Sequence, residues 1–246
     1  MSDPFLSVII PAFNEEPRLT STLEQIISYL TLRGLTFEIL VVDDGSYDKT
    51  SEIVRFFSNR GDPLWQLRLF RNDQNRGKGY SVRRGMLESH GKYALLTDAD
   101  LSTPIEQMPR LEREVIKGAY DITFGSRDVE GSQIEIHQSW FREGSGKFFN
   151  RVMRLLMGLS FHDTQCGFKL FRMDRCRDLF REQTIENFCF DVEILYIAQK
   201  KGFPMKEVPV LWHHVTGSKV RMVSDAVRMF WDLFRIRLND LLGHYG

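Results

Sequence analysis

Two carboxylates separated by one small residue, Asp98-Ala99-Asp100, end an apolar run that begins at Tyr93. The run lies between turn-forming residues, which predicts a short buried strand. Alternate side chains of an extended chain point the same way, so the two carboxylates would repel and raise each other's pKa unless a cation neutralised them. Oxygen ligands favour Mg²⁺ or Mn²⁺ over zinc, and such a cation commonly also holds a substrate's phosphates. The triplet therefore predicts a metal site, although solvated turns also contain it.

Strands and helices are predicted to alternate before this triplet. Apolar runs at 6–10, 37–42 and 65–70 predict three earlier strands, and helical spacing of apolar residues predicts helices after each of them and after the triplet. This alternation predicts an α/β fold, with a mostly parallel sheet flanked by helices. Ligands of such sheets bind at the carboxyl ends of the strands.

Polar side chains follow each of the earlier strands. Asn14 and Glu15 follow the first, Asp43 and Asp44 the second, and Lys78, between two glycines, the third. Any one of them alone is explained more readily as a cap or a turn. Together at one edge they predict a nucleotide site, in which Asp43 suits a base edge or ribose hydroxyl and Lys78 a diphosphate. The spacing G-x-G-x-x-G is absent after the first strand, which disfavours a nicotinamide dehydrogenase.

The composition is that of a folded globular protein. The chain has 246 residues, is 42% hydrophobic and has a formal net charge of zero, so nothing global points to nucleic acid. Its three cysteines lack C-x-x-C spacing, which favours a reducing cytosol. Neither a signal peptide nor an apolar run long enough to span a bilayer is visible in the sequence. We therefore expect a cytoplasmic protein, peripheral on the cytoplasmic face of a membrane if it binds one.

Four motifs follow one another in the first hundred residues, SVIIPAFNEE (7–16), VVDDGS (41–46), NRGKG (75–79) and DAD (98–100). In order and spacing they resemble the successive motifs of the family 2 inverting glycosyltransferases, which have the GT-A fold. Three more motifs come later, FGSR (124–127), DTQCGFK (163–169) and FDVE (190–193). These resemble the polyprenyl-phosphate branch of that family, above all the dolichyl-phosphate β-glucosyltransferases, and the resemblance covers roughly residues 6–223.

The resemblance implies a nucleotide-sugar donor, Mg²⁺ or Mn²⁺ at Asp98 and Asp100, and a lipid monophosphate acceptor. It implies a GT-A domain over 1–217, with a nucleotide-sugar half (1–100) and an acceptor half (101–217), followed by an amphipathic helical tail (218–246). The nucleotide-sugar-binding residues that it implies, together with the loop analysis above, are Pro11, Ala12, Asn14, Glu15, Asp43, Lys78, Asp98, Ala99, Asp100 and Lys219.

On the acceptor side, Arg127, Arg142 and Ser145 match by motif the positions that hold the acceptor phosphate in dolichyl-phosphate mannose synthases. Two guanidinium groups and a hydroxyl suit a phosphate dianion, although surface ion pairs would also explain the arginines. A phosphate acceptor is already ionised, so no strong general base is required. Asp191 is therefore predicted to orient groups on the acceptor side. Asp98, Asp100, Asp191 and Arg127 are the predicted catalytic residues.

Two stretches, 141–159 and 218–242, combine apolar residues at helical spacing with cations. In the second, Phe230, Leu233 and Phe234 are predicted to share a face opposite Asp232 and Arg235. Such helices suit a membrane interface, with the cations on lipid head groups. An oligomer contact and packing against the chain's own domain are the alternatives.

The leading hypothesis is transfer of a hexose, glucose from UDP-glucose, to a dolichyl or undecaprenyl monophosphate with inversion. Three alternatives stay open from the sequence. They are the same transfer from GDP-mannose, a family 2 transferase with a soluble acceptor, and a catalytically silent membrane-binding module.

Overall fold

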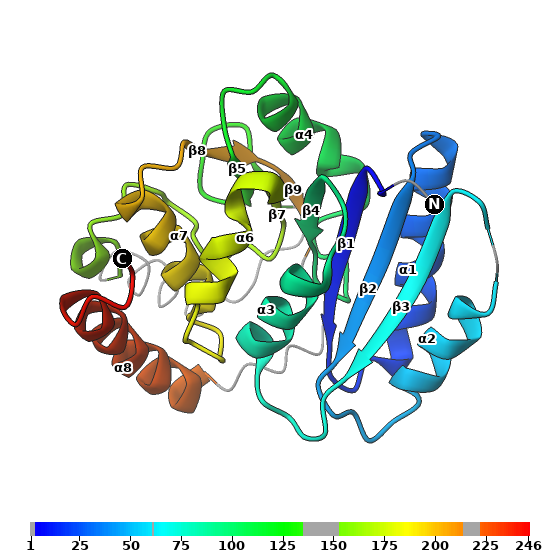
Figure 1. The fold of residues 1–246 in the computed structure, drawn as a ribbon, viewed down its shortest axis with the longest axis horizontal. Helices are drawn as coiled ribbons and strands as arrows, with labels where there is room; N and C mark the ends of the chain where they lie inside the picture. The colour runs from blue at the N-terminus through cyan, green and yellow to red at the C-terminus, as the bar shows by residue number, and fades with distance from the viewer. Residues whose placement is uncertain (1–2, 61, 135–152, 214–221) are drawn as a thin grey trace.

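A single seven-stranded sheet forms the centre of the molecule, a computed structural model that describes residues 3–60, 62–134, 153–213 and 222–246 (Figure 1). The strand order is β3-β2-β1-β4-β7-β5-β8. β7 runs antiparallel to both of its neighbours, and the other pairings are parallel. The strands are β1 (Leu6–Ala12), β2 (Phe37–Asp43), β3 (Trp65–Arg71), β4 (Tyr93–Leu96), β5 (Ile122–Ser126), β7 (Lys169–Arg172) and β8 (Met205–Pro209), with β6 (Gln133–Ile134) and β9 (Leu211–Trp212) paired separately.

Helices cover both faces of the sheet, because strands buried on two sides alternate their apolar side chains between two cores. Val8 and Val41 face the core that α1, α2 and α4 complete, whereas Ile9 and Leu40 face the core that α3, α6, α7 and α8 complete. The helices are α1 (Glu16–Leu32), α2 (Thr50–Ser58), α3 (Lys78–Glu88), the 3₁₀ helix η1 (Ile105–Gln107), α4 (Met108–Ile116), α6 (Met173–Glu182), α7 (Phe190–Lys200) and α8 (Met222–Leu241).

The predicted α/β architecture with a mostly parallel sheet is confirmed, and two details differ from the expectation. The antiparallel β7 and the helix α6 that follows it were not predicted. The predicted strand before the acidic triplet is shorter than expected. β4 ends at Leu96, and a turn closed by a hydrogen bond from the Leu101 N–H to the Asp98 carbonyl contains the triplet. The two carboxylates are therefore arranged by a turn and not by an extended strand.

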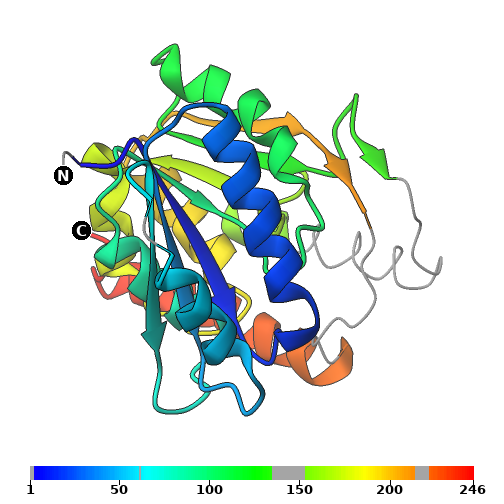
Figure 2. The same ribbon diagram turned by 90° about the vertical axis from the view of Figure 1, so that its right-hand side faces the viewer.

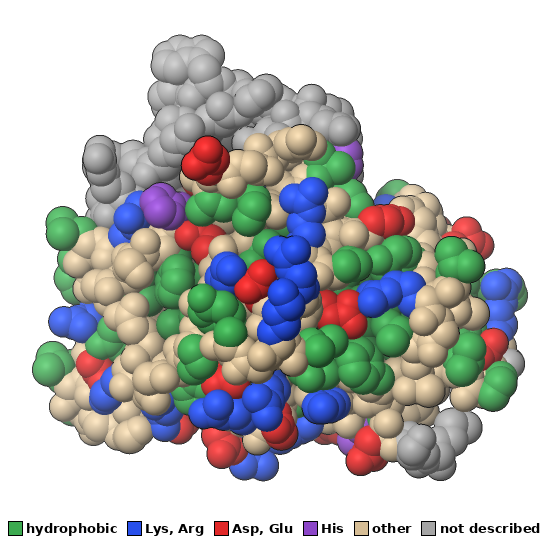
Figure 3. All heavy atoms as spheres, turned by 90° about the horizontal axis from the view of Figure 1, so that it is seen from above, with side chains coloured by type: hydrophobic (Ala, Val, Ile, Leu, Met, Phe, Trp, Pro, Cys, Tyr) green, Lys and Arg blue, Asp and Glu red, His purple; other side chains and the backbone are tan. Residues whose placement is uncertain are grey.

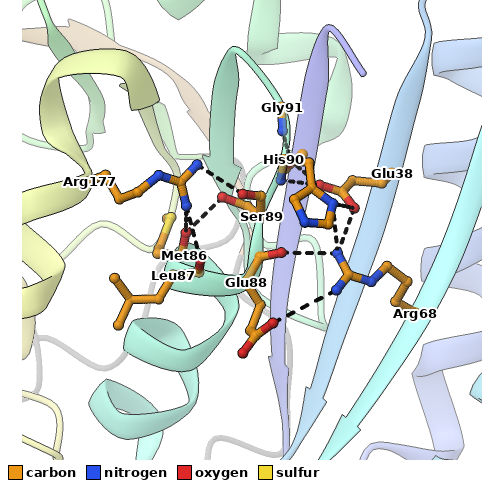
Figure 4. Close-up of polar contacts among 10 residues, drawn as sticks. Glu38, Arg68, Met86, Leu87, Glu88, Ser89, His90, Gly91 and Arg177 are labelled. Carbon is orange, nitrogen blue, oxygen red and sulfur yellow. Dashed lines mark hydrogen bonds and ion pairs between the residues drawn. The ribbon is translucent and has the colours of Figure 1, made fainter. Parts of the chain in front are cut away.

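At the amino ends of the strands, a buried carboxylate joins three elements (Figure 4). Glu38 is fully buried and accepts hydrogen bonds from the Ser7 hydroxyl, the His90 N–H and Arg68, at 2.6, 2.6 and 3.0 Å. Beside it, Arg177 donates to three carbonyls at the end of α3, including that of Ser89 at 2.9 Å. The molecular surface at this end of the sheet mixes acidic and basic side chains with separate apolar ones (Figure 3). This end of the sheet is a structural anchor.

The carboxyl ends of β1 to β3 point to the opposite side of the molecule, where α8 also lies (Figures 1 and 2). α8 packs through Leu233 and Ile236, both fully buried, into the core that includes α7. The faces of this helix differ from the expectation, because Leu233 and Asp232 are buried while Phe230 and Phe234 are exposed. Of the other amphipathic stretch, only 153–159 is described. None of the helices in the described ranges has the length and apolar character needed to span a bilayer.

Candidate active site

Hydrogen bonds between backbone and side chains hold the loop after β1 against the loop after β2. The Asn14 N–H donates to the Ser46 hydroxyl and the Asn14 side-chain oxygen accepts from the Tyr47 N–H, both at 2.8 Å. Asn14 has a φ of 52°, which asparagine tolerates better than most residues. The Glu15 N–H donates to Thr50 at 2.8 Å. The predicted site residues Pro11 and Ala12, the last two of β1, therefore lead into a braced loop.

Asp43, the predicted nucleoside ligand, is fully buried and already bonded within the protein. One oxygen accepts from the Ser46 N–H at 2.8 Å, and the other accepts from the Ser51 hydroxyl and lies 3.3 Å from Arg71. A contact between Asp43 and a nucleoside stays a prediction, and it would have to share these bonds. The structure shows a second role that the sequence did not indicate, which is to brace the turn after β2.

Asp44 fixes the loop that leads to Lys78. Its carboxylate accepts from the Asn72 side chain at 2.7 Å and from the N–H groups of Arg76 and Gly77 at 3.0 and 2.8 Å. Gly77 has a φ of 114°, and a Cβ there would lie 2.4 Å from the Glu186 carbonyl. The glycine thus permits close approach of the chain's own backbone, and the approach of Lys78 to a diphosphate stays a prediction. The loop presents Lys78 from the first turn of α3.

Each carboxylate of the acidic triplet has a cation of its own. The Lys78 ammonium lies 2.6 Å from Asp98, and the Arg18 guanidinium lies 3.7 Å from Asp100. Arg18 in turn contacts Glu15 at 2.8 Å, which links the loop after β1 to the loop after β4. The backbone of Ala99, the middle residue, accepts a hydrogen bond from Thr22 of α1 at 2.6 Å. The triplet is therefore held from both sides.

The carboxylates of Asp98 and Asp191 both stabilise the charged form of Lys78. Burial would lower the pKa of the Lys78 ammonium, but the carboxylates of Asp98, Asp191 and Asp100 outweigh that effect and hold the pKa above its usual value. Lys78 is therefore a protonated lysine among three acidic groups. The predicted residues Lys78, Asp98, Asp100 and Asp191 therefore lie close enough for their charges to interact.

Lys169 is a member of this cluster that the sequence did not single out. Its ammonium lies 2.6 Å from Asp191 and also donates to the Cys166 carbonyl, and its side chain is 1% exposed. Burial raises the pKa of Asp191, while Lys169 and Lys78 oppose that shift. A lysine inside the apolar segment 168–171 is the sequence feature that could have indicated a buried charge. Arg18, three residues after Glu15, was also missed.

Gly167 lies directly against the acidic triplet. A Cβ on this residue would be 2.1 Å from one carboxylate oxygen of Asp98, closer than any stable contact. The segment 166–169 therefore borders Asp98 through its glycine and supports Asp191 through its lysine. The antiparallel strand β7, which begins at Lys169 beside Leu96 of β4, therefore places this segment at the site.

Arg127 forms a two-pronged ion pair with Asp163. Its Nε and Nη2 atoms lie 2.6 and 2.8 Å from the two carboxylate oxygens, and its N–H donates to the same group at 3.1 Å. Its guanidinium also lies 5.4 Å from the ring centroid of Trp212. The predicted contact of Arg127 with an acceptor phosphate would have to use Nη1 or displace Asp163. Arg142, Ser145 and Lys219 lie outside the described residues, so their predicted roles stay predictions.

The donor chemistry at the triplet fits a hard divalent cation. Asp98 and Asp100 supply oxygen atoms, and both side chains are partly exposed, at 35% and 26%. In the described part of the chain, no three His, Cys, Asp or Glu residues are grouped as a metal site. A cation held by Asp98 and Asp100 would take its other ligands from a phosphate or from water, as Mg²⁺ bound through one or two carboxylates usually does.

The fold matches solved glycosyltransferase structures. Mannosyl-3-phosphoglycerate synthase from Rubrobacter xylanophilus superposes with a TM-score of 0.71 at 17% identity, covering 98% of this chain and 74% of that one. Glucosyl-3-phosphoglycerate synthase from Mycobacterium tuberculosis, solved with Mn²⁺, UDP-glucose and glycerol 3-phosphate, has a TM-score of 0.66 at 17% identity and covers 96% and 79%. These matches confirm the GT-A fold.

Sequence comparison gives the family. Dolichyl-phosphate beta-glucosyltransferase from Dictyostelium discoideum is 39% identical over 248 residues, which cover 97% of this chain and 76% of that protein. The human and Saccharomyces cerevisiae proteins of the same name are 35% and 36% identical, cover 97% and 98% of this chain, and are each matched over 76% of their length. Residues 7–180 match the model of Glycosyl transferase family 2. The chain therefore belongs to glycosyl transferase family 2.

Proposed function

We propose that this glycosyltransferase moves glucose from UDP-glucose to a polyprenyl monophosphate of the dolichyl type, with inversion at the anomeric carbon. The observation that carries the proposal is the cluster of Lys78, Asp98, Asp100 and Asp191 beside the carboxyl ends of parallel strands. It combines oxygen donors for a cation with a protonated lysine, which is what a sugar diphosphate requires. The names of the curated relatives support glucose and dolichyl phosphate.

Mg²⁺ or Mn²⁺ is the cofactor that we propose for Asp98 and Asp100. A bound divalent cation would supply neutralisation of the charge that develops on the departing diphosphate. Support comes from the donor chemistry of the two aspartates and from the Mn²⁺ in the glucosyl-3-phosphoglycerate synthase structure. Lys78 and Arg18, which now neutralise these aspartates, would then be able to turn towards the phosphates.

The chain's own residues would act mainly by positioning. A phosphate oxygen of the acceptor attacks the anomeric carbon from the side opposite the diphosphate. A bond from that carbon to the acceptor oxygen forms as its bond to the diphosphate oxygen breaks, and the electron pair leaves with UDP. No proton has to be removed, because the attacking oxygen is already ionised at neutral pH. Lys78 would stabilise the leaving diphosphate, and Asp191 would hold Lys78 in place.

The acceptor phosphate would bind to Arg127, Arg142 and Ser145. Arg127 supports this role through its rigid attachment to Asp163, which leaves Nη1 outside that pair of bonds. The loop of residues 11–15, Asp43 and Lys219 complete the proposed donor site.

Release of nucleoside diphosphate from several nucleotide sugars, with and without a short-chain polyprenyl phosphate and with Mg²⁺ or Mn²⁺, tests this function. Release of UDP from UDP-glucose only when the lipid phosphate is present is the expected result, and proton NMR of the product should show the inverted anomer. Release from GDP-mannose instead would overturn the donor. Release that does not depend on the lipid phosphate would overturn the proposed acceptor. No release from any donor would indicate a catalytically silent module.

A further inference from the structure

From residue 227 onwards, where its side chains are described, the outer face of α8 has no polar side chains except arginines. Between residues 227 and 242, the exposed side chains are apolar ones at helical spacing and three cations. The two acidic residues of this range belong to the inner face, where Asp232 is buried and Asp240, 19% exposed, pairs with Lys200. The exposed residues are Val227, Arg228, Phe230, Trp231, Phe234, Arg235, Arg237, Leu238, Leu241 and Leu242. A helix that is apolar on both faces is normally covered on both.

The aromatic side chains of this face form one exposed cluster. The rings of Phe230 and Phe234 have centroids 5.0 Å apart, and Trp231 lies 6.1 Å from Phe234. Trp231 is 68% exposed, and Leu241, two turns further along the helix from Phe234, is 85% exposed. A continuous apolar surface of this kind marks an interaction site.

The charges on the face distinguish between a second copy of the chain and a lipid surface. Pairing two copies symmetrically along α8 would bring arginines together with no exposed carboxylate of the same helix between 227 and 238 to meet them. An anionic bilayer surface complements the arginines and takes up tryptophan and phenylalanine at the level of its head groups. The composition therefore favours lipid.

The position of α8 favours the same occupant. The helix lies on the side of the molecule towards which β1 to β3 point, the side of the candidate active site (Figures 1 and 2). The opposite side carries charges of both signs (Figure 3). A molecule docked through α8 would hold its active site towards the bilayer surface, where a polyprenyl phosphate head group is found.

We propose that the outer face of α8 docks on an anionic membrane surface, with Phe230, Trp231, Phe234 and Leu238 inserted among the head groups and with Arg228 and Arg235 on lipid phosphates. This inference deepens the proposed function and rests on it for the lipid acceptor. The inner face of α8, with Leu233 and Ile236, stays packed on the protein.

Co-sedimentation with vesicles tests the docking. The unmodified chain should bind vesicles of phosphatidylcholine and phosphatidylserine and should bind much less to phosphatidylcholine alone. Trp231→Ser with Phe234→Ser should weaken binding by more than about tenfold, because two exposed aromatic anchors are lost. Arg228→Gln with Arg235→Gln should weaken it by about fivefold for each arginine, and high salt should imitate that loss.

A matched control removes two exposed apolar residues elsewhere. Leu32 and Phe56 are 88% and 59% exposed on α1 and α2, so Leu32→Ser with Phe56→Ser should leave vesicle binding unchanged. An equal loss in this control, or no vesicle binding by the unmodified chain, would overturn the proposal. So would a dimer, seen by light scattering, that dissociates in the aromatic variant, because α8 would then be covered by a second copy.

Turnover separates this proposal from the proposed function. With a short polyprenyl phosphate dissolved in detergent, the α8 variants should release UDP at the rate of the unmodified chain, which also shows that they are folded. If the unmodified chain binds vesicles but releases no UDP, the proposed function is contradicted and the docking proposal stands. If it releases UDP but does not bind vesicles, the docking proposal is contradicted and the proposed function stands.

Discussion

The ammonium of Lys169 lies 2.6 Å from the carboxylate of Asp191, and the two side chains are only 1% and 4% exposed. Breaking a buried pair leaves an uncompensated charge, so Lys169→Met should lower the free energy of unfolding by about 3–5 kcal/mol. Turnover should fall by about 100-fold, because Asp191 no longer holds its position beside Lys78. Chemical denaturation and UDP release measure the two effects.

The matched double variant, Lys169→Met with Asp191→Asn, separates stability from catalysis. It removes both charges, so it should recover much of the lost unfolding free energy. It should not recover turnover if Asp191 positions Lys78. Recovery of full turnover in the double variant would show that neither residue serves the reaction.

Gly167 is predicted to control the position of Asp98. In Gly167→Ala the new methyl group would overlap Asp98, which has to turn away because its flexible carboxylate is the group in contact. We expect turnover to fall by roughly 10- to 100-fold while the unfolding free energy stays within about 1 kcal/mol. Asp98→Ala removes the atoms that the new methyl group would overlap. The double variant, Asp98→Ala with Gly167→Ala, should therefore have the same unfolding free energy as Asp98→Ala alone.

The parts of the site that the sequence predicted come from the regular portion of the fold. Parallel strands place their following loops at one edge, so Lys78 and Asp98 were expected to be neighbours although they are twenty residues apart. Their ion pair at 2.6 Å bears out that neighbourhood. The predicted extended geometry of the triplet was wrong, because the strand ends at Leu96 and side-chain alternation no longer applies.

The parts that the sequence did not predict depend on contacts between distant segments. Lys169 reaches Asp191 only because β7 inserts antiparallel between β4 and β5, a topology that local periodicity does not encode. Periodicity also failed to orient α8. The helix has apolar residues of its own on all sides, so periodicity placed the adjacent residues Leu233 and Phe234 on one face. In the structure, Leu233 is buried and Phe234 is exposed.

Glu38 is predicted to serve stability and not the reaction. In Glu38→Gln the side-chain NH2 would face either Arg68 or the Ser7 hydroxyl and the His90 N–H, so one of these would lose its acceptor, and the negative charge beside Arg68 is removed. The unfolding free energy should fall by about 1–3 kcal/mol. The KM for the donor should not change, because this cluster lies at the other end of the sheet (Figure 4).

A nearby exposed carboxylate provides the control for Glu38. Glu88 is half exposed and lies 3.9 Å from the same arginine, so Glu88→Gln should change the unfolding free energy by less than about 0.5 kcal/mol. Equal effects of the two variants would refute the special role of the buried carboxylate.

The pair of Arg127 and Asp163 predicts a loss of stability in acid. Burial would raise the pKa of Asp163, but the Arg127 guanidinium outweighs it and holds that pKa below its usual value. A lowered pKa adds stability above the unfolded-state value of about 3.9, and this stability is lost as the pH falls towards the folded-state pKa. The difference in unfolding free energy between the unmodified chain and Asp163→Asn should therefore be largest near neutral pH and shrink below about pH 4.

Denaturation at a series of pH values measures this difference, and Asp178→Asn is its control. Asp178 is 71% exposed and pairs with Arg181 on the surface, so its replacement should give a small difference with little change over the same range. If the difference in unfolding free energy between the unmodified chain and Asp163→Asn stayed constant with pH, the pKa of Asp163 would be the same in the folded and unfolded states.

Asp98 and Asp100 are predicted to be needed for turnover and for its dependence on a divalent cation. Each is partly exposed and bonded to a flexible cation, so Asp98→Asn and Asp100→Asn should keep the fold. UDP release should fall by roughly 100-fold or more, because the charge on the departing diphosphate is no longer neutralised. In the unmodified chain, chelation with EDTA should stop release and Mn²⁺ should restore it. Asp73→Asn, in the loop after β3, controls for the loss of an exposed carboxylate and should keep full activity. Release that survives both EDTA and the two substitutions would mean that the lysine and arginine side chains alone neutralise the diphosphate.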